Sequence, residues 1–466
     1  MRALIYRVAT GFPAASVALF AKALVPRRIY RFAATIAGLV AFFGMSYLYE
    51  YGDRDLYKNI LTSYGILPFQ FPFVDISFSL AAWECARQGV DVILSDPCDV
   101  LHRGYSYSPL WITASPIRLG VGDTATVGWC LDVLFIGSLS LLPPPRRSVE
   151  LVLMLAATFS TMVVFAVERA NLDIVLFVLA LAAGLLAECR TSVRFIGYCL
   201  ALVAALLKYY PIMVLTIVFR ERLAIFGALG LIIAGALVVF WAKYHVEIAR
   251  GMSGIPSGPY NTDLFAAKNL PLMMGVVVES FVERSPLAAP VGSIVTGGIY
   301  AALVVACINH CRHLLRFAEL RAALSSQPCL ERVLLVIGSA VIAGCFFAGQ
   351  SVGYRGVFFL QVMPGLLTIS RSSSRDVRNL GLRASVVIVL LMWGECFRLG
   401  IDRGLEHACG SELLIGEVKI FFWLIRELGW WWTVSIMLTV LTDFILDSPI
   451  MRWLSSRTGH SVMRVR

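Results

Sequence analysis

The chain has 466 residues, of which 58% are hydrophobic and only 15% are charged, and its formal net charge is +10. Soluble globular proteins contain about 45–50% apolar residues, so this composition excludes an ordinary soluble protein. The basic excess does not indicate nucleic-acid binding, because the Lys and Arg residues lie in short runs between apolar windows, as membrane orientation requires. We therefore expect one all-α integral membrane domain over residues 1–466, with no nucleic acid among its partners.

Apolar windows long enough to cross a bilayer, which takes about 20 residues, recur along the chain. The expected spans are 31–49, 122–142, 149–167, 171–187, 223–241, 287–306, 333–349, 355–369, 382–397 and 428–446. Together with the segment 195–219, they predict a polytopic bundle of about 10–12 transmembrane segments. Residues 1–28 are expected to form an amphipathic helix that lies on the basic side of the membrane.

Three polar stretches interrupt the apolar windows, at 50–121, 242–286 and 398–427, and are expected to form outer loops. The first of them should hold an amphipathic helix near 75–88 that rests on the membrane surface. The two termini and the loops on their side carry most of the Lys and Arg residues, which marks that side as cytoplasmic. The stretch 50–121 is therefore expected to face the periplasm or an equivalent space.

The segment 195–219 predicts a re-entrant hairpin. Arg194 precedes it and Arg220 and Arg222 follow it. If both ends are cytoplasmic, each arm has about 12 residues, or about 18 Å of helix, which is too short to cross about 30 Å of hydrocarbon. The tip would be LKYYP at 207–211. The alternative is one ordinary span, which would place several later basic loops on the outer side.

The eleven cysteines show no metal-ligand spacing. Most of them lie in apolar windows, where Cys is usually a small core residue. Two pairs could form disulfides if their loops face an oxidising space, namely Cys85 with Cys98 and Cys396 with Cys409.

Asp75 is the first candidate for chemistry, in the polar stretch that follows the first span. A carboxylate at the outer mouth of a membrane cavity can act as a general base on a hydroxyl, which contributes about 10²–10⁴-fold to a rate. The structural alternative is a helix N-cap, worth roughly 1 kcal/mol. A divalent metal shared with Glu84 is conceivable, but the spacing does not support it, so no cofactor is expected.

A second group of polar residues lies almost without a loop between two apolar runs, at Glu168, Arg169, Asn171 and Asp173. Ionisable residues inside a membrane are costly and usually functional. These residues either line a cavity or form a tight turn that is neutralised by its own ion pairs.

Further cations lie near the membrane at the hairpin tip and at the start of the span 355–369. Lys208, with Tyr209 and Tyr210, suits a lipid-linked phosphate, or is a snorkelling Lys beside interfacial Tyr residues. Arg355, after Tyr354, carries a fork of donors that fits a phosphate, or pairs with a nearby carboxylate.

In this order, the motifs resemble the GT-C class of membrane glycosyltransferases, and most closely the polyprenyl-phosphate-dependent mannosyltransferases of glycosyltransferase family 87. The segments that carry the likeness are FPFVD at 71–75, WECARQGVDV at 83–92, DPCDVLHRGYSYSPLW at 96–111, ERANLDIVLFVLAL at 168–181, LKYYPIMVL at 207–215 and GYRGVFFLQVMPGLL at 353–367. The chain departs from the family at Ser108, Ala170 and Gly353, where family members often have Pro, Gly and Asn.

The resemblance implies a GT-C-like bundle and a hexosyltransferase that moves a sugar from a polyprenyl-phosphate donor to a lipid or glycan acceptor, with inversion, at the periplasmic face of the bacterial inner membrane. Asp75 would be the general base, and Arg355, Lys208 and Tyr209 would hold the donor phosphate. The sugar or acceptor pocket would be formed by Glu168, Arg169, Asn171, Asp173, Glu84, Arg103, Tyr107 and Tyr354. No metal is implied.

Other functions remain open at this point. A transporter or flippase of lipid-linked sugars would also need cations near a lipid phosphate, but transporters often have paired broken helices in two related halves, and only one hairpin is expected here. Glycan ligases and polymerases resemble this chain less, because their large outer loop comes later. A scaffold subunit would not explain charges inside apolar runs.

Overall fold

The computed structural model describes residues 30–93, 95–113, 115–189, 191–253, 264–282, 288–409 and 412–457. Within these ranges the chain is helical and contains no strand, and its one extended pairing is an isolated bridge between Leu264 and Val352. The predicted all-α polytopic membrane architecture is thereby confirmed. The amphipathic segment expected at 1–28 lies outside the described residues.

Six helices in the described part of the chain are long and apolar enough to cross a bilayer. They are α3 (Tyr30–Glu50), the continuous helix of η1 (Val121–Asp123), α7 (Thr124–Ser138) and η2 (Leu139–Leu141), α12 (Leu223–Ser253), α14 (Ala288–Leu315), α16 (Cys329–Ala348) and α20 (Glu412–Leu446). The number rises to eight if each of two bent pairs is one span. These pairs are α8 (Ser148–Thr158) with α9 (Thr161–Glu168), bent by 43°, and α18 (Arg375–Met392) with α19 (Gly394–Cys409), bent by 62°.

Shorter helices occupy the remaining expected spans 171–187 and 355–369, the hairpin and part of 242–286. Apolar helices of this kind are α10 (Leu172–Ala187), η3 (Tyr210–Arg220), α13 (Asn269–Phe281) and, after η4 (Gly353–Phe358), α17 (Phe359–Ile369). At 16 residues, α10 is about 24 Å long, which is shorter than the hydrocarbon core. The expected total of about 10–12 spans therefore includes helices that do not cross on their own, and short polar helices, α15 (Ala318–Ser325) and α21 (Pro449–Arg457), lie between or after the long ones.

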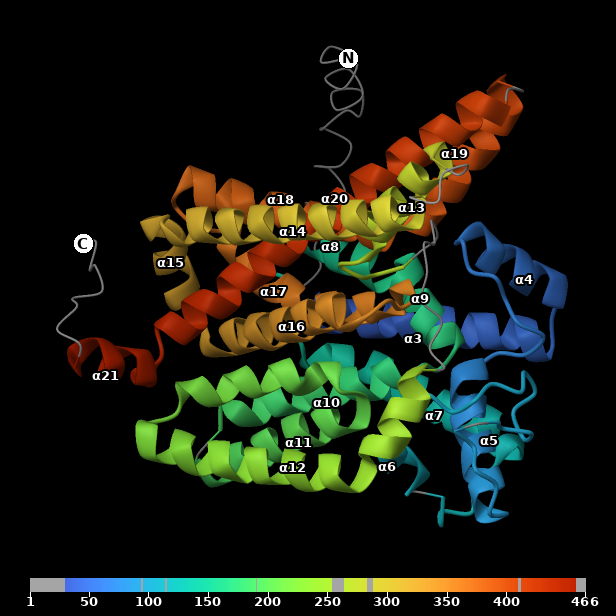
Figure 1. Ribbon diagram of the computed structural model, residues 1–466, viewed down its shortest axis with the longest axis horizontal. Helices are drawn as coiled ribbons and strands as arrows, with labels where there is room; N and C mark the ends of the chain where they lie inside the picture. The colour runs from blue at the N-terminus through green and yellow to red at the C-terminus, as the bar shows by residue number, and fades with distance from the viewer. Residues whose placement is uncertain are drawn as a thin grey trace.

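The core of the bundle is α16, which lies between α14 and α20 on one side and α10, α11 (Thr191–Lys208) and α12 on the other (Figure 1). Of its apolar window 78% is buried, against 6% for α12 and 11% for α14. This contrast places α16 inside the protein and leaves α12 and α14 to face lipid.

The ranges 242–286 and 398–427, expected as loops, carry helix. α12 continues to Ser253 and α13 follows from Asn269, while α19 and α20 cover most of the second range. The charges that suggested a loop at 398–427 are neutralised between helices. One example is Arg426, whose Nη1 lies 2.6 Å from the Oε1 atom of Glu395.

The first polar stretch contains α4 (Arg54–Ser63), α5 (Val74–Arg87) and α6 (Pro109–Ile112). The helix expected near 75–88 is thus present as α5, but it does not rest on a surface, because residues 74–82 are all buried. The polar side of α5 carries small side chains such as Ser77 and Ser79, which are buried against neighbouring segments of the protein.

The predicted hairpin is formed by α11 and η3, which pack along each other. Their ends are joined where Arg194 Nη1 lies 2.8 Å from Glu221 Oε1, and Arg220 Nη1 lies 2.7 Å from Glu188 Oε1. The chain therefore returns to the end from which it entered, with Tyr209 at the turn.

Candidate functional site

The start of α5 is attached to the turn between α9 and α10. Phe73, the N-cap residue, has a φ of 65° and donates its N–H to the Glu168 carbonyl (2.8 Å). The Asp75 N–H donates to the Arg169 carbonyl (3.2 Å). The N-cap alternative for Asp75 is wrong, because Phe73 takes that position and no side chain caps the helix. The Asp75 carboxylate is free to face the turn.

This carboxylate is 6% exposed and lies between two guanidinium groups. The Nδ2 of Asn171 donates to its Oδ2 (2.6 Å), while the Nη1 atoms of Arg169 and Arg103 lie 3.6 and 3.8 Å from its Oδ1. One oxygen is therefore held by an amide and the other faces two cations, which fixes the orientation of the group.

The turn at 168–171 explains how Asn171 reaches Asp75. Ala170 is fully buried and has a φ of 42°, which lets α9 and α10 meet without an intervening loop. Asn171 is the N-cap of α10, and its Oδ1 accepts from the Asp173 N–H (2.9 Å). Because its amide also donates to Asp75, one side chain both caps a helix and orients the candidate base.

Arg169 forms an ion pair within the turn at 168–171. Its Nε lies 3.7 Å from Glu168 Oε2, and its guanidinium lies over the rings of Phe69 (4.4 Å) and Phe165 (4.5 Å). The segment is thus a tight turn with its own ion pair, and the same Arg also faces Asp75. The tight-turn alternative is therefore confirmed, and of the four residues Glu168 also lines a described cavity.

Asp173 is the centre of a second charged group and is completely buried. Its Oδ1 accepts from Lys208 Nζ (2.5 Å) and from the Tyr210 hydroxyl (2.7 Å), and its Oδ2 lies 4.0 Å from Arg355 Nε. One carboxylate therefore gathers donors from the hairpin tip and from η4. Two cations that share one carboxylate leave an excess of positive charge.

The cations themselves are enclosed by aromatic rings. Lys208 Nζ lies 5.0 Å from the centre of the Tyr107 ring and 5.6 Å from that of Tyr354, and Arg355 lies 4.7 Å over the Tyr210 ring. The snorkelling alternative for Lys208 is wrong, because this residue is 8% exposed and paired in the interior. For Arg355 the structure shows the pairing with a carboxylate, and phosphate binding stays a prediction.

Tyr107 joins the two charged groups. Burial raises its pKa well above the usual range, and the negative charges of Asp75 and Asp173, together with Tyr354, raise it further. Tyr107 therefore lies near both carboxylates. Asp75, Asp173 and their partners form one cluster, which we call the Asp75–Asp173 cluster.

Two of the expected site residues lie elsewhere. Glu84 accepts the N–H of Val121 (3.2 Å) at the start of the α7 helix. Tyr209 has a φ of 33°, and its ring lies against Phe240 with a centre-to-centre distance of 6.4 Å. The unusual backbone at Tyr209 turns consecutive phenols in different directions, so Tyr210 and not Tyr209, which was expected at the donor phosphate, lies with Lys208 at Asp173.

One residue of the site was not predicted. Asp99 holds Arg103 through two hydrogen bonds, from Nε to Oδ2 (2.9 Å) and from Nη2 to Oδ1 (3.1 Å). The opposite charges four residues apart were the available signal, since such spacing often forms pairs. Arg103 also lies over the Phe78 ring (4.5 Å), which completes its fixation near Asp75.

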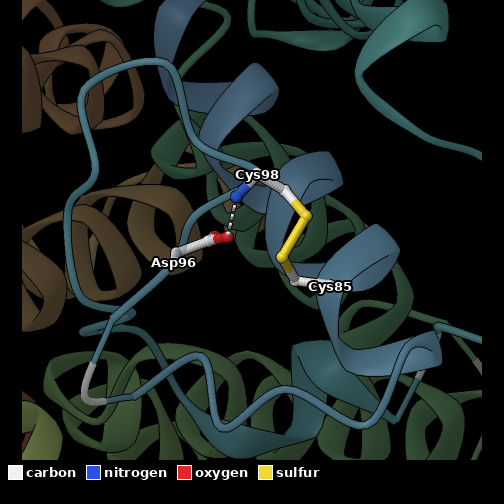
Figure 2. A group of neighbouring side chains, drawn as sticks. All are labelled: Cys85, Asp96 and Cys98. Carbon is white, nitrogen blue, oxygen red and sulfur yellow. Dashed lines mark hydrogen bonds between the residues drawn. A yellow bond between two sulfur atoms is a disulfide. The ribbon is translucent and has the colours of Figure 1, made fainter.

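A disulfide ties this loop to α5. Cys85 is bonded to Cys98, and the Asp96 carboxylate beside them accepts the Cys98 N–H at 3.1 Å (Figure 2). These three residues form a group that could hold a metal ion, but the disulfide occupies both sulfurs. The other pair that was considered is wrong, because Cys396 and Cys409 lie on one helix, about 20 Å apart, and a disulfide needs less than about 7 Å.

Comparisons of the chain with protein-family models, with curated proteins and with solved structures find no match in any of the three. The likeness to glycosyltransferase family 87 therefore rests on the motifs of the chain and remains a prediction.

Proposed function

We propose that the chain is a membrane glycosyltransferase that transfers a sugar from a polyprenyl-phosphate donor to a hydroxyl of a lipid or glycan acceptor. The observation that carries this proposal is the Asp75–Asp173 cluster. It combines a buried carboxylate of fixed orientation with a neighbouring group of two cations and a phenol. A general base and an anion-stabilising group side by side are what a sugar transfer from a phosphate requires.

In the proposed reaction, Asp75 accepts the proton of the acceptor hydroxyl. The hydroxyl oxygen forms a bond to the anomeric carbon as the bond from that carbon to the phosphate oxygen breaks, so the configuration inverts. The electron pair stays on the departing lipid phosphate. Lys208, Arg355 and the Tyr210 hydroxyl stabilise its developing charge, and the excess positive charge around Asp173 suits that role.

Asp173 has a positioning role in this scheme. It already holds Lys208 and Tyr210 at hydrogen-bond distance, so the donors are oriented before the phosphate arrives. Preorganised donors of this kind cost no rearrangement at the moment of reaction. By the resemblance to a family of mannosyltransferases, the transferred group is a hexose, and the reaction serves the cell envelope at the periplasmic face of the bacterial inner membrane.

The proposal is tested with Asp75→Asn, which keeps the shape of the side chain and removes its basicity. Transfer from a radiolabelled polyprenyl-phosphate sugar is measured in membranes, and we expect a loss of about 10²–10⁴-fold. The matched control is Asp55→Asn, because Asp55 is an exposed carboxylate in the first turn of α4. Undiminished turnover by Asp75→Asn removes this residue from the role of base.

The phosphate assignment is tested separately with Arg355→Ala. We expect weaker binding of the donor and little change for the acceptor, because the Arg355 guanidinium lies in the cation group around Asp173. A titration that finds equal donor affinity for wild type and variant would defeat the assignment.

A transporter or flippase of lipid-linked sugars is the second candidate, favoured by the break between α11 and η3 at Tyr209. Broken helices at the substrate site are common in transporters. This function predicts movement of a lipid-linked sugar across proteoliposomes without transfer to an acceptor. In that case neither the wild type nor Asp75→Asn would transfer sugar to an acceptor.

A further inference from the structure

A cavity of about 460 Å³ lies among α3, α4, α7, α8 and α9. Its volume is within the range of about 300–1,000 Å³ that is typical of small-molecule sites. Its wall includes the aromatic side chains of Phe42, Tyr57, Phe73, Trp129 and Phe135. Among the described residues that line it, the charged ones are Glu50 and Glu168, and none is Lys, Arg or His. In a chain with a net charge of +10, this is an acidic, aromatic cavity.

Glu168 places a buried carboxyl group in this wall. Its side chain is 3% exposed, and its Oε2 has no hydrogen-bond partner. The nearest cation, Arg169 Nε, lies 3.7 Å from that oxygen, which is too far for a hydrogen bond. A buried carboxylate oxygen without a donor is costly and needs an explanation.

Asp132 is a second buried carboxyl group without hydrogen-bond partners, on a helix that contributes to the cavity wall. It lies on α7 between Trp129 and Phe135, is completely buried, and neither of its carboxylate oxygens has a hydrogen-bond partner. Two buried acidic groups in helices that cross the membrane need a proton, a cation or a ligand.

Two aromatic rings in or near the cavity wall already contact guanidinium groups of the protein. Arg54 lies 4.8 Å over the ring of Tyr49, which is another cavity-lining residue, and Arg169 lies 4.5 Å over Phe165. Aromatic faces attract ammonium and guanidinium groups through the ring quadrupole, most strongly where water is excluded. A carboxylate at the end of an aromatic cavity adds direct charge attraction.

We propose that this cavity binds a lipophilic organic cation, an amine or quaternary ammonium with an apolar tail. The ammonium lies between Glu168 and the Tyr57 ring, and the tail lies along the apolar wall that includes Phe42 and Trp129. The site goes beyond the proposed sugar transfer, since its occupation requires no sugar donor and neither Lys208 nor Arg355 lines it, while it shares Glu168 with the residues expected around the sugar or acceptor.

A second hollow of about 560 Å³ adjoins this cavity. It lies between α3 and α7 and shares Ser46, Glu50 and Trp129 with the cavity. The exposed carboxylate of Glu50 therefore lines both spaces. A negative charge there favours a cationic head group over an anionic one.

The test is a binding measurement with the full-length protein in lipid nanodiscs, with radiolabelled decyltrimethylammonium as the probe and empty nanodiscs as the blank. The neutral carbon analogue, in which a tert-butyl group replaces the trimethylammonium, is the matched ligand. We expect saturable binding of the cation, at least about tenfold tighter than that of the neutral analogue, which corresponds to about 1.4 kcal/mol. Equal binding of the two ligands overturns the proposal.

Glu168→Gln should weaken binding of the cation about tenfold or more and leave the neutral analogue unchanged. The control is Glu319→Gln, which alters an exposed carboxylate on α15 and should change neither ligand. If Glu168→Gln does not fold, Tyr57→Leu replaces it, since this change removes a ring and keeps the charge. A selective loss of the cation supports the proposal, and an equal effect on both ligands contradicts it. Because no transfer is measured, this result stands independently of the glycosyltransferase assay.

Discussion

Replacing Asp173 by Asn removes the one carboxylate that Lys208, Tyr210 and Arg355 share, at almost constant side-chain volume. The buried bond from Lys208, 2.5 Å long, loses its charged acceptor and so ceases to be an ion pair. The Tyr210 hydroxyl, at 2.7 Å, can still donate to the amide oxygen. Removal of one partner from a buried ion pair costs about 3–5 kcal/mol, because the other charge stays buried and unpaired. We therefore expect a loss of stability of this size.

The assay is thermal unfolding of the purified protein in detergent, followed by tryptophan fluorescence. The double variant Asp173→Asn/Lys208→Met should recover part of the loss, because it also removes the uncompensated ammonium, and the two changes should couple by more than about 1 kcal/mol. Asp55→Asn, on the exposed face of α4, should stay within about 0.5 kcal/mol of wild type. An unchanged melting temperature for Asp173→Asn, or strictly additive losses in the double variant, would refute the pairing.

Three further changes test separate features by melting temperature. Ala170→Gly should keep or raise stability, because a left-handed backbone costs a non-glycine residue about 1–2 kcal/mol, whereas Ala170→Val should lower it by at least about 2 kcal/mol; equal effects would contradict the backbone at 170. The pair Cys85→Ser/Cys98→Ser should lose up to about 3 kcal/mol and become insensitive to reductant; a reductant-sensitive variant would contradict the disulfide. Burial raises the pKa of Asp96, so the folded protein holds this proton more tightly than the unfolded chain. The charged form therefore lowers stability at neutral pH, and the cost fades as the pH falls through the raised pKa. Asp96→Asn should stabilise the protein at pH 7 but not at acidic pH, and a pH-independent difference would refute the assignment.

Several features of the cluster could be predicted because membrane burial makes charges conspicuous. Asp173 and Arg355 lie within or beside apolar runs, where each charge needs a reason. The hairpin followed from the short distance in sequence between Arg194 and Arg220, and the ion pair between Arg194 and Glu221 joins the ends of its two arms. In these cases the pattern of charged and apolar residues within one short segment was enough for the prediction.

The partners of these charges could not be predicted, because each pairing joins residues that are distant in sequence. Asp173 is 35 residues from Lys208, and no periodicity relates them. The choice of Tyr210 over Tyr209 depends on one backbone angle. The helices in 398–427 were missed because their charges suggested a solvated loop. Arg426, for example, pairs with Glu395 on another helix and can therefore be buried.

The 11-residue η3 is long for a 3₁₀ helix, since such runs seldom exceed 3–4 residues. This winding rises about 2.0 Å per residue and an α-helix about 1.5 Å. Converting η3 to an α-helix would therefore shorten this arm by about 5 Å and draw the hairpin tip along the arm's axis. Lys208 and Tyr210 flank that tip, so the winding of η3 helps to set how far the hairpin carries these two donors toward Asp173.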